Sequence, residues 1–502
     1  MTDVMAKRNR HRYADDMSYA GAPVMSSSLS KAILELDVLV GGMGVEVSSL
    51  ELVTAVANHP SRRMSGSLSA TALADVYTRR LQLGDPGGAI REAFSAFQEA
   101  VPALAADVER LFAAHFIPGG KAPEAPFKAL NIGGMTPPRD VQILTVVSTF
   151  AHIWRAKKLA PGRPIGVNFL RKIERPLLYG LYGAVLAGVD WVVMGAGDPS
   201  QIPGFLRRLA RHEPTELPIQ VATVPLGQYK VRFDPRELVG PSLKDLPVPA
   251  FLAILSNHLQ CRGLAANPET RPDGFVIEGP AAGGHNPPPA KKTRDGRGNY
   301  QYGPEDEADL AAVAEVGLPY WAAGGRAVPR PLSSDPVPGR QVGTLFALSS
   351  DSGMEPSLRK RALELIWKQQ LEVVSGANSS PSGYAFKVAM VPGTLGAPEV
   401  YAKRERVCNL GHLRGYRPKD GAVVGLCPAD VTPIYTGSGG AAWRVQGAMC
   451  LCNGLMAACG LGQPGEPAVV TLGEIAPVRE LQRRLRRIDY TAAQAADYLI
   501  GL

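Results

Sequence analysis

Short, uninterrupted apolar runs alternate with helical patterns along most of the chain. Because the runs lack polar alternation, we expect strands buried on both faces, as in a parallel sheet covered by helices. Seven runs qualify, and an eighth strand, second in order, is expected between the 60s and the 140s, where the pattern is weak. The seven runs are residues 36–40, 164–170, 190–194, 217–224, 274–277, 318–322 and 341–348.

Glycine-rich segments follow nearly all of these runs, which places the functional loops on one face. In a (β/α)8 barrel that face carries the active site. We therefore predict an α/β fold, a (β/α)8 TIM barrel with a helical insertion near residues 79–160, where 86–100 and 101–116 have helical patterns. The predicted organisation is a flexible basic tail (1–30), the barrel (31–380) and a cysteine-bearing C-terminal extension packed on it (381–502).

Composition is that of an ordinary globular protein. The 502 residues are 45% hydrophobic and 20% charged, which allows a sizeable core. The net charge of +8 is concentrated partly in two runs, residues 7–12 and 479–487. Neither run has interleaved aromatic residues or a recognised module, so no nucleic-acid partner is expected.

Six cysteines in a chain of this length do not indicate a secreted disulfide scaffold. The N-terminus is polar and basic, and no apolar run is long enough for a membrane span, so we expect a cytoplasmic protein without a membrane partner. Four cysteines of the extension leave two alternatives open, a zinc or iron–sulfur site with His412 and Cys459 nearby, or small buried thiols. They are Cys408, Cys427, Cys450 and Cys452, and they contain no Cys-x2-Cys pair.

The most informative segment is Gly-Pro-Ala-Ala-Gly-Gly-His, residues 279–285. It directly follows a buried strand, and it ends in a histidine, His285. Imidazole transfers protons near neutral pH, and glycines let the backbone approach a planar ligand closely. This arrangement favours a flavin-type active site.

Six segments together resemble the nitronate monooxygenase family, the FMN-dependent enzymes also called 2-nitropropane dioxygenases. The order and the spacing of the segments both agree with that family, and the resemblance covers roughly residues 35–350. It rests on Gly41-Gly42-Met43-Gly44 with residues 45–49, Gly166-Val167-Asn168-Phe169, residues 192–197, residues 281–285, Ala322-Ala323-Gly324-Gly325, and residues 341–346.

The resemblance implies that FMN is the cofactor and that His285 is the catalytic base. The phosphate would lie at the loops after strands seven and eight, where bare backbone amides are available. The cofactor-binding residues implied are Gly41, Gly42, Met43, Gly44, Asn168, Gly283, Gly284, Ala323, Gly324, Gly325, Gly343 and Thr344.

Three functional hypotheses remain. The first is a nitronate monooxygenase, in which His285 removes the α proton of a small nitroalkane and the nitronate is oxidised with dioxygen. The second is an NAD(P)H-using, FMN-dependent enoyl reductase acting on carrier-bound thioesters in fatty acid or polyketide biosynthesis, with an acyl carrier protein as partner. The third is a flavoprotein without turnover of its own. Under each of the three hypotheses, a homodimer is one of the assemblies considered.

Two departures from the family pattern concern the site. Family members that act on nitronates commonly have an acidic residue before Ala-Gly-Gly-His, whereas Gly279-Pro280-Ala281 stands here and Glu278 lies further upstream. A Pro/Ser-rich stretch, residues 326–340, occupies the place of the helix between strands seven and eight. The polar segment 286–305 is expected to cover the site.

Overall fold

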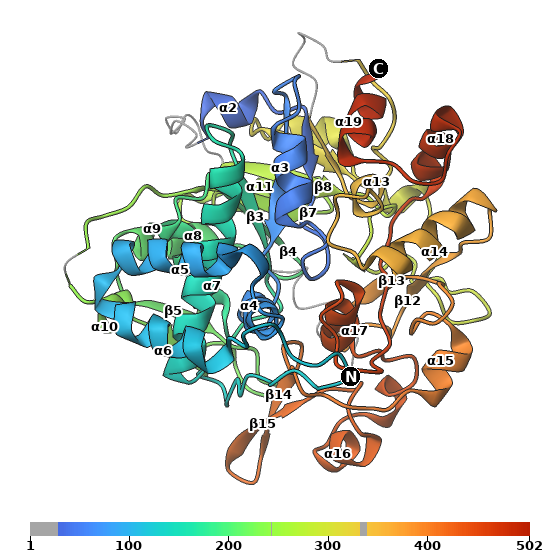
Figure 1. Cartoon of the computed structure of the whole chain (residues 1–502). Helices are drawn as coiled ribbons and strands as arrows, with labels where there is room; N and C mark the ends of the chain where they lie inside the picture. Colours follow the sequence, from blue (N-terminus) through green and yellow to red (C-terminus); the bar gives the residue numbers. More distant parts are fainter. Residues whose placement is uncertain (1–28, 242, 332–338) are drawn as a thin grey trace.

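Eight parallel strands close into a barrel in the computed structural model, which describes residues 29–241, 243–331 and 339–502 (Figure 1). Each strand pairs with the next barrel strand along the chain, and the last returns to the first. The predicted (β/α)8 architecture is confirmed. The strands are β1 (Val38–Val40), β2 (Met64–Ser69), β3 (Gly166–Leu170), β4 (Trp191–Gly195), β7 (Ala250–Leu255), β8 (Gly274–Glu278), β10 (Tyr320–Ala323) and β11 (Gly339–Val342).

Helices follow or precede these strands and cover the outside of the barrel (Figure 1). Up to the end of β11 the α-helices are α2 (Lys31–Leu34), α3 (Leu50–Ala57), α4 (Leu73–Gln82), α5 (Ala89–Ala100), α6 (Ala105–His115), α7 (Arg139–Leu159), α8 (Leu177–Leu186), α9 (Ile202–Ala210), α10 (Pro235–Val239), α11 (His258–Ala266) and α12 (Leu310–Ala314). Short 3₁₀ helices are η1 (Pro86–Gly88), η2 (Pro102–Leu104), η3 (Pro304–Asp306) and η4 (Ala442–Arg444).

The second barrel strand has the sequence Met-Ser-Gly-Ser-Leu-Ser, and all six of its residues are buried. Small side chains are needed there because Trp191 fills the barrel interior. The Trp191 indole donates to Ser67 Oγ at 3.0 Å, and a Cβ added at Gly166, its neighbour on β3, would overlap that indole. The strand therefore lacks an apolar signal because its neighbours supply the bulk.

The sequence predicted that the run 217–224 forms the fifth barrel strand, and this prediction is wrong. Residues Thr215–Pro218 form β5, which pairs antiparallel with β6 (Lys230–Phe233) in a separate two-stranded sheet. The barrel position belongs to β7, which pairs with β4 and β8. Burial along β5 alternates, whereas β7 is buried at almost every position, as a strand covered on both faces requires.

The segment between β2 and β3 contains α4, α5, α6 and α7, in the region where the helical insertion was predicted. Aromatic side chains hold these helices together: Phe94 of α5 packs edge-on against Phe112 of α6, and Phe97 against Phe150 of α7. α7 also packs along α8, so the added helices are tied to the barrel's own helical layer.

The rest of the chain, after β11, wraps around the side of the barrel (Figure 1). Its β12 and β13 form a sheet with β9 (His285–Asn286), which lies beyond the end of β8. The elements are α13 (Thr344–Ala347), α14 (Pro356–Trp367), β12 (Val373–Gly376), β13 (Ala385–Ala389), α15 (Pro398–Lys403), β14 (Gly415–Lys419), β15 (Ala422–Leu426), α16 (Thr432–Gly437), α17 (Leu451–Ala458), α18 (Ala476–Leu485) and α19 (Ala492–Ile500).

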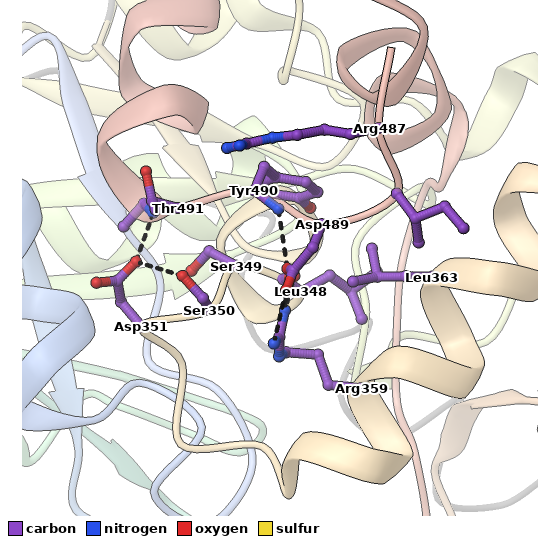
Figure 2. A network of polar contacts seen from close by, with 12 residues as sticks. Leu348, Ser349, Ser350, Asp351, Arg359, Leu363, Arg487, Asp489, Tyr490 and Thr491 are labelled. Carbon is purple, nitrogen blue, oxygen red and sulfur yellow. Dashed lines mark hydrogen bonds and ion pairs between the residues drawn. The ribbon is translucent and has the colours of Figure 1, made fainter. Parts of the chain in front are cut away.

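A polar network fastens the residues at the start of α19 to α13, to α14 and to the segment between these two helices (Figure 2). Arg359 donates to both carboxylate oxygens of Asp489, at 2.5 and 3.2 Å. The N–H of Ala492 donates to Asp351 at 2.7 Å, and the hydroxyl of Tyr490 donates to the carbonyl of Leu345 at 2.7 Å. The C-terminal helix is thereby fixed beside the first turn after β11.

Replacing Arg359 by methionine is expected to lower the free energy of unfolding by about 1 kcal/mol, because a bidentate contact between a largely buried guanidinium and a half-exposed carboxylate is lost. The hydrogen bond from Arg359 is the first cause that lowers the pKa of Asp489. The stabilisation is therefore present above the carboxyl's ordinary pKa, about 4, and is lost as pH falls through its lowered value.

Denaturant titrations of Arg359→Met and wild type at neutral and acidic pH measure this difference. The matched control is Arg361→Met, at an exposed position of the same helix. An equal effect of both substitutions, or a difference that does not shrink at acidic pH, would contradict the role given to the network.

Two sequence predictions fall largely outside the described residues: the flexible tail, of which only residues 29 and 30 are described, and the middle of the Pro/Ser-rich stretch, 332–338. Among the helices that the structure describes, none combines the length and the apolar character required to cross a membrane.

Candidate functional site

Two adjoining cavities, each about 160 Å³ in volume, lie where the loops after the barrel strands meet. All but two of the residues predicted for the site line the first cavity; Asn168 and His285 line the second. The structure thus gathers the predicted residues at one end of the barrel. The residues that line both cavities are Gly42, Gly44, Glu278, Gly283, Gly284, Gln341 and Thr471.

The loop after β10 turns sharply through two glycines. Gly324 and Gly325 have φ angles of 78° and 67°, in the left-handed region that residues with a Cβ rarely adopt. A Cβ at Gly324 would also lie 2.8 Å from the backbone nitrogen of Ala282. The turn therefore exposes bare backbone to the first cavity and brings the loops after β8 and β10 together.

A wall of the first cavity comes from residues 471–474, which the sequence reasoning missed. The N–H of Gly473 donates to the Thr344 hydroxyl at 2.8 Å, and the N–H of Gly284 donates to the Thr471 hydroxyl at 2.9 Å. The segment Thr-Leu-Gly-Glu has no signal beyond one glycine, and it is more than a hundred residues from its partners. Only the fold reveals it.

Two side chains of the first cavity carry buried polar atoms with no hydrogen-bond partner among the described residues. They are the guanidinium nitrogen Nε of Arg326 and the amide oxygen Oε1 of Gln341. An unpaired buried polar atom is costly, so each is a candidate ligand contact. A cationic donor and a neutral acceptor in a glycine-lined cavity match a ligand with a phosphate and a polar-edged ring, and the residues present thus fit FMN.

His285 does not lie on the sixth barrel strand itself. It lies on β9, where it pairs with Phe386 of β13, and its ring packs edge-on against the Phe386 ring with centroids 4.9 Å apart. Its Nε2 and the hydroxyl of Ser380 are 2.7 Å apart, and Ser382 is 3.4 Å away. The strand pairing and these two serines therefore set the position of the ring at the second cavity.

Burial lowers the pKa of His285 well below its ordinary value, and the positive charge of Lys172 lowers it further. The imidazole is consequently neutral at physiological pH, and its affinity for a proton is lower than that of an exposed histidine. Ser380 was not predicted as a site residue. It lies in Ser-Ser-Pro-Ser, residues 379–382, a pattern that is typical of a polar turn.

Three further ionisable groups are half-buried near the histidine. Burial raises the pKa of Glu278 to about 7 against the opposing effect of Lys387 and Lys172. Burial likewise lowers the pKa of Lys172 to about 7 and that of Lys387 to about 8, against the effect of Glu278. The Nζ of Lys172 has no hydrogen-bond partner in the described structure and lies 3.3 Å from the ring centroid of Tyr384. Glu278 thus supplies a carboxyl group to both cavities.

Glu278→Gln is expected to gain stability relative to wild type as pH rises from about 5 to about 8, by about 1–3 kcal/mol. The folded protein holds a proton on Glu278 up to about pH 7, whereas the unfolded chain releases it near its ordinary pKa. The stability that the protonated Glu278 contributes to the wild type is therefore fully present below the ordinary carboxyl pKa. It is lost as pH rises through the raised pKa of the folded protein.

Thermal denaturation of both proteins over this pH range tests the expectation. Glu99→Gln, at an exposed position of α5, serves as the control. A stability difference between Glu278→Gln and wild type that stays constant with pH would show that the carboxyl is not buried as described.

The segment 286–305 does not line either cavity, contrary to expectation. It lies instead against β12: the N–H of Tyr300 donates to the carbonyl of Ser375 at 2.8 Å, and Asn299 bridges to Gly376. The described residues that cover the second cavity from outside the barrel loops come mainly from the C-terminal region. They include Phe386, His412, Leu413, Leu451, Cys452, Leu455 and Thr471.

The cysteines of the extension are free thiols in the structure. Cys408 and Cys427 are buried together against Ala429 and Ala448, with Cys450 beside them. Cys452 lines the second cavity. Across residues 29–241, 243–331 and 339–502, no three or more His, Cys, Asp or Glu side chains are arranged to hold a metal ion.

Comparison with known proteins leaves the family open. No protein-family model and no curated protein sequence matches the chain. Fourteen chains of solved structures match. One is the enoyl reductase domain of MlnA from the macrolactin biosynthesis cluster of Bacillus amyloliquefaciens, with 12% sequence identity and a TM-score of 0.35. The match covers 74% of this chain and 65% of the MlnA domain, and a likeness this distant does not establish an activity.

Proposed function

We propose that the protein is an FMN-dependent oxidoreductase, most simply one that oxidises a nitronate or nitroalkane with dioxygen. The observation that carries the proposal is the pair of orphaned atoms, Arg326 Nε and Gln341 Oε1, in a glycine-lined cavity beside a buried neutral histidine. Bound FMN would supply electron transfer at its ring. Gly324, Gly325, Gly343 and Thr344 would hold the phosphate end, together with Arg326.

His285 would accept the α proton of a nitroalkane in the second cavity. A general base must be unprotonated at working pH and held within reach of the substrate. The lowered pKa supports the first condition, and the contact with Ser380, which fixes the ring at the second cavity, supports the second. Glu278 at the same cavity would replace the acidic residue that the sequence lacks before Ala282.

An NAD(P)H-dependent enoyl reductase is the second candidate. The specific observation in its favour is the apolar lining of the second cavity, which suits an acyl chain better than a small nitro compound. Phe169, Ile254, Phe386, Leu451 and Leu455 contribute to that lining. Glu278, whose raised pKa keeps its carboxyl group protonated up to about pH 7, would then donate a proton to the reduced acyl group.

The deciding experiment is anaerobic reduction of the flavin in the purified protein. A yellow protein that releases FMN is expected for both reactions, and a colourless protein that does not take up FMN would refute both. Bleaching by a nitronate alone would support the monooxygenase, whereas rapid bleaching by NADPH or NADH would support the reductase.

A further inference from the structure

A third cavity lies between α4, α7 and α8, and we call it the distal chamber. It adjoins the second cavity, because six residues line both: Thr71, Ala72, Phe169, Leu170, Ile173 and His412. Part of its wall comes from the helical insertion, through Val141 of α7 and through Leu130 and Ile132 in the segment before α7. A ligand that reacts beside His285 and extends into the chamber would pass these shared residues.

The chamber's lining is mainly apolar, and several of its polar side chains already have partners in the protein. His412 and Asp75 bond to each other at 2.8 Å. The hydroxyls of Thr145 and Thr149 donate to backbone carbonyls of their own helix, and Arg175 donates to the carbonyls of residues 133, 134 and 411. These groups would gain little from a polar ligand, so the chamber favours an apolar one.

The size of the chamber limits what it can hold. A volume of about 40 Å³ has room for about three water-sized groups, by the usual requirement for one buried water. An aliphatic tail of about three methylene or methyl groups has the same size. Aromatic rings and branched tails would need more room.

We propose that the distal chamber binds the aliphatic end of an unbranched substrate whose reacting group occupies the second cavity. This rests on the proposed function, since it names the substrate class of that same site. Each methylene that moves from water into the chamber should tighten binding about three- to fourfold. Binding should stop improving once the chamber is full.

The probes are saturated straight-chain fatty acids of about four to about twelve carbons, a range chosen because affinity follows buried methylenes. Their binding to the FMN-loaded protein is measured by calorimetry. Two variants fill the chamber: Leu130→Trp, in the segment before α7, and Val141→Phe, on α7. Leu159→Trp, an exposed position of the same helix, is the matched control.

Wild type and Leu159→Trp should show affinity rising with chain length to a plateau. In Leu130→Trp or Val141→Phe the plateau should come about three carbons earlier, with a loss of about thirtyfold or more for the longest acids. Unchanged chain-length profiles in both filled variants, or no fatty-acid binding at all, would overturn the inference. The FMN content of each sample distinguishes failure of this inference from failure of the proposed function. A protein that takes up no FMN but shows the expected chain-length profiles would refute the proposed function alone.

Discussion

Replacing His285 by asparagine should lower the turnover of a neutral nitroalkane about a hundredfold or more, because the general base is lost. A preformed nitronate needs no deprotonation, so its oxidation should change little. FMN binding should also be retained, since His285 lines the second cavity and not the first. Steady-state rates with both substrate forms, on samples of equal FMN content, measure the difference.

Ser380→Ala provides a graded version of the same test. The serine hydroxyl holds the imidazole Nε2 but does not replace it, so this variant should lose less turnover than His285→Asn. Its pH–rate profile should shift, because the hydroxyl contact to the ring is gone. If His285→Asn turned over nitroalkane and nitronate at the same fraction of the wild-type rates, His285 would not be the base.

Replacing Gly324 by valine should reduce FMN affinity about a hundredfold or more. A β-branched residue at a φ of 78° is strained, and its Cβ would lie 2.8 Å from the backbone of Gly279 and Ala282. The turn must open, which displaces the amides that would hold the phosphate. Fluorescence titration of the apoprotein with FMN gives the affinity.

Gly317→Val separates loss of the cofactor from general destabilisation. Gly317 has a φ of 75°, nearly that of Gly324, but open space surrounds its Cβ position, and it precedes β10 instead of following it. This variant should share the backbone strain and keep FMN affinity. Equal loss of FMN in both variants would mean that strain alone, and not the cavity, explains the effect.

The barrel could be predicted because most of its strands are apolar runs that end in glycine. The exceptions have a physical cause. β2 is built of serine and glycine because Trp191 and Val40 fill the space beside it. The run 217–224 is apolar enough for a barrel strand, but only tertiary pairing shows that its first two residues belong to a separate two-stranded sheet and that the rest forms no strand.

The residues of the candidate site also fall into two groups, those that the sequence pattern could predict and those that it could not. The glycines and His285 could be predicted because they follow strands in a known order. Ser380, Thr471 and Gly473 could not, since single serines, threonines and glycines in distant loops carry no pattern. Arg326 and Gln341 stood in the sequence beside predicted residues, but their lack of partners becomes visible only when the surrounding atoms are known.

The wall formed by residues 471–474 has a consequence for the order of events during synthesis. Gly284 and Thr344 hydrogen-bond to this segment, so the first cavity is incomplete on a nascent chain that ends before it. The eight barrel strands, in contrast, are all translated by residue 342. The barrel strands could therefore pair on the ribosome, whereas the proposed FMN site would be complete only after more than a hundred further residues have been added.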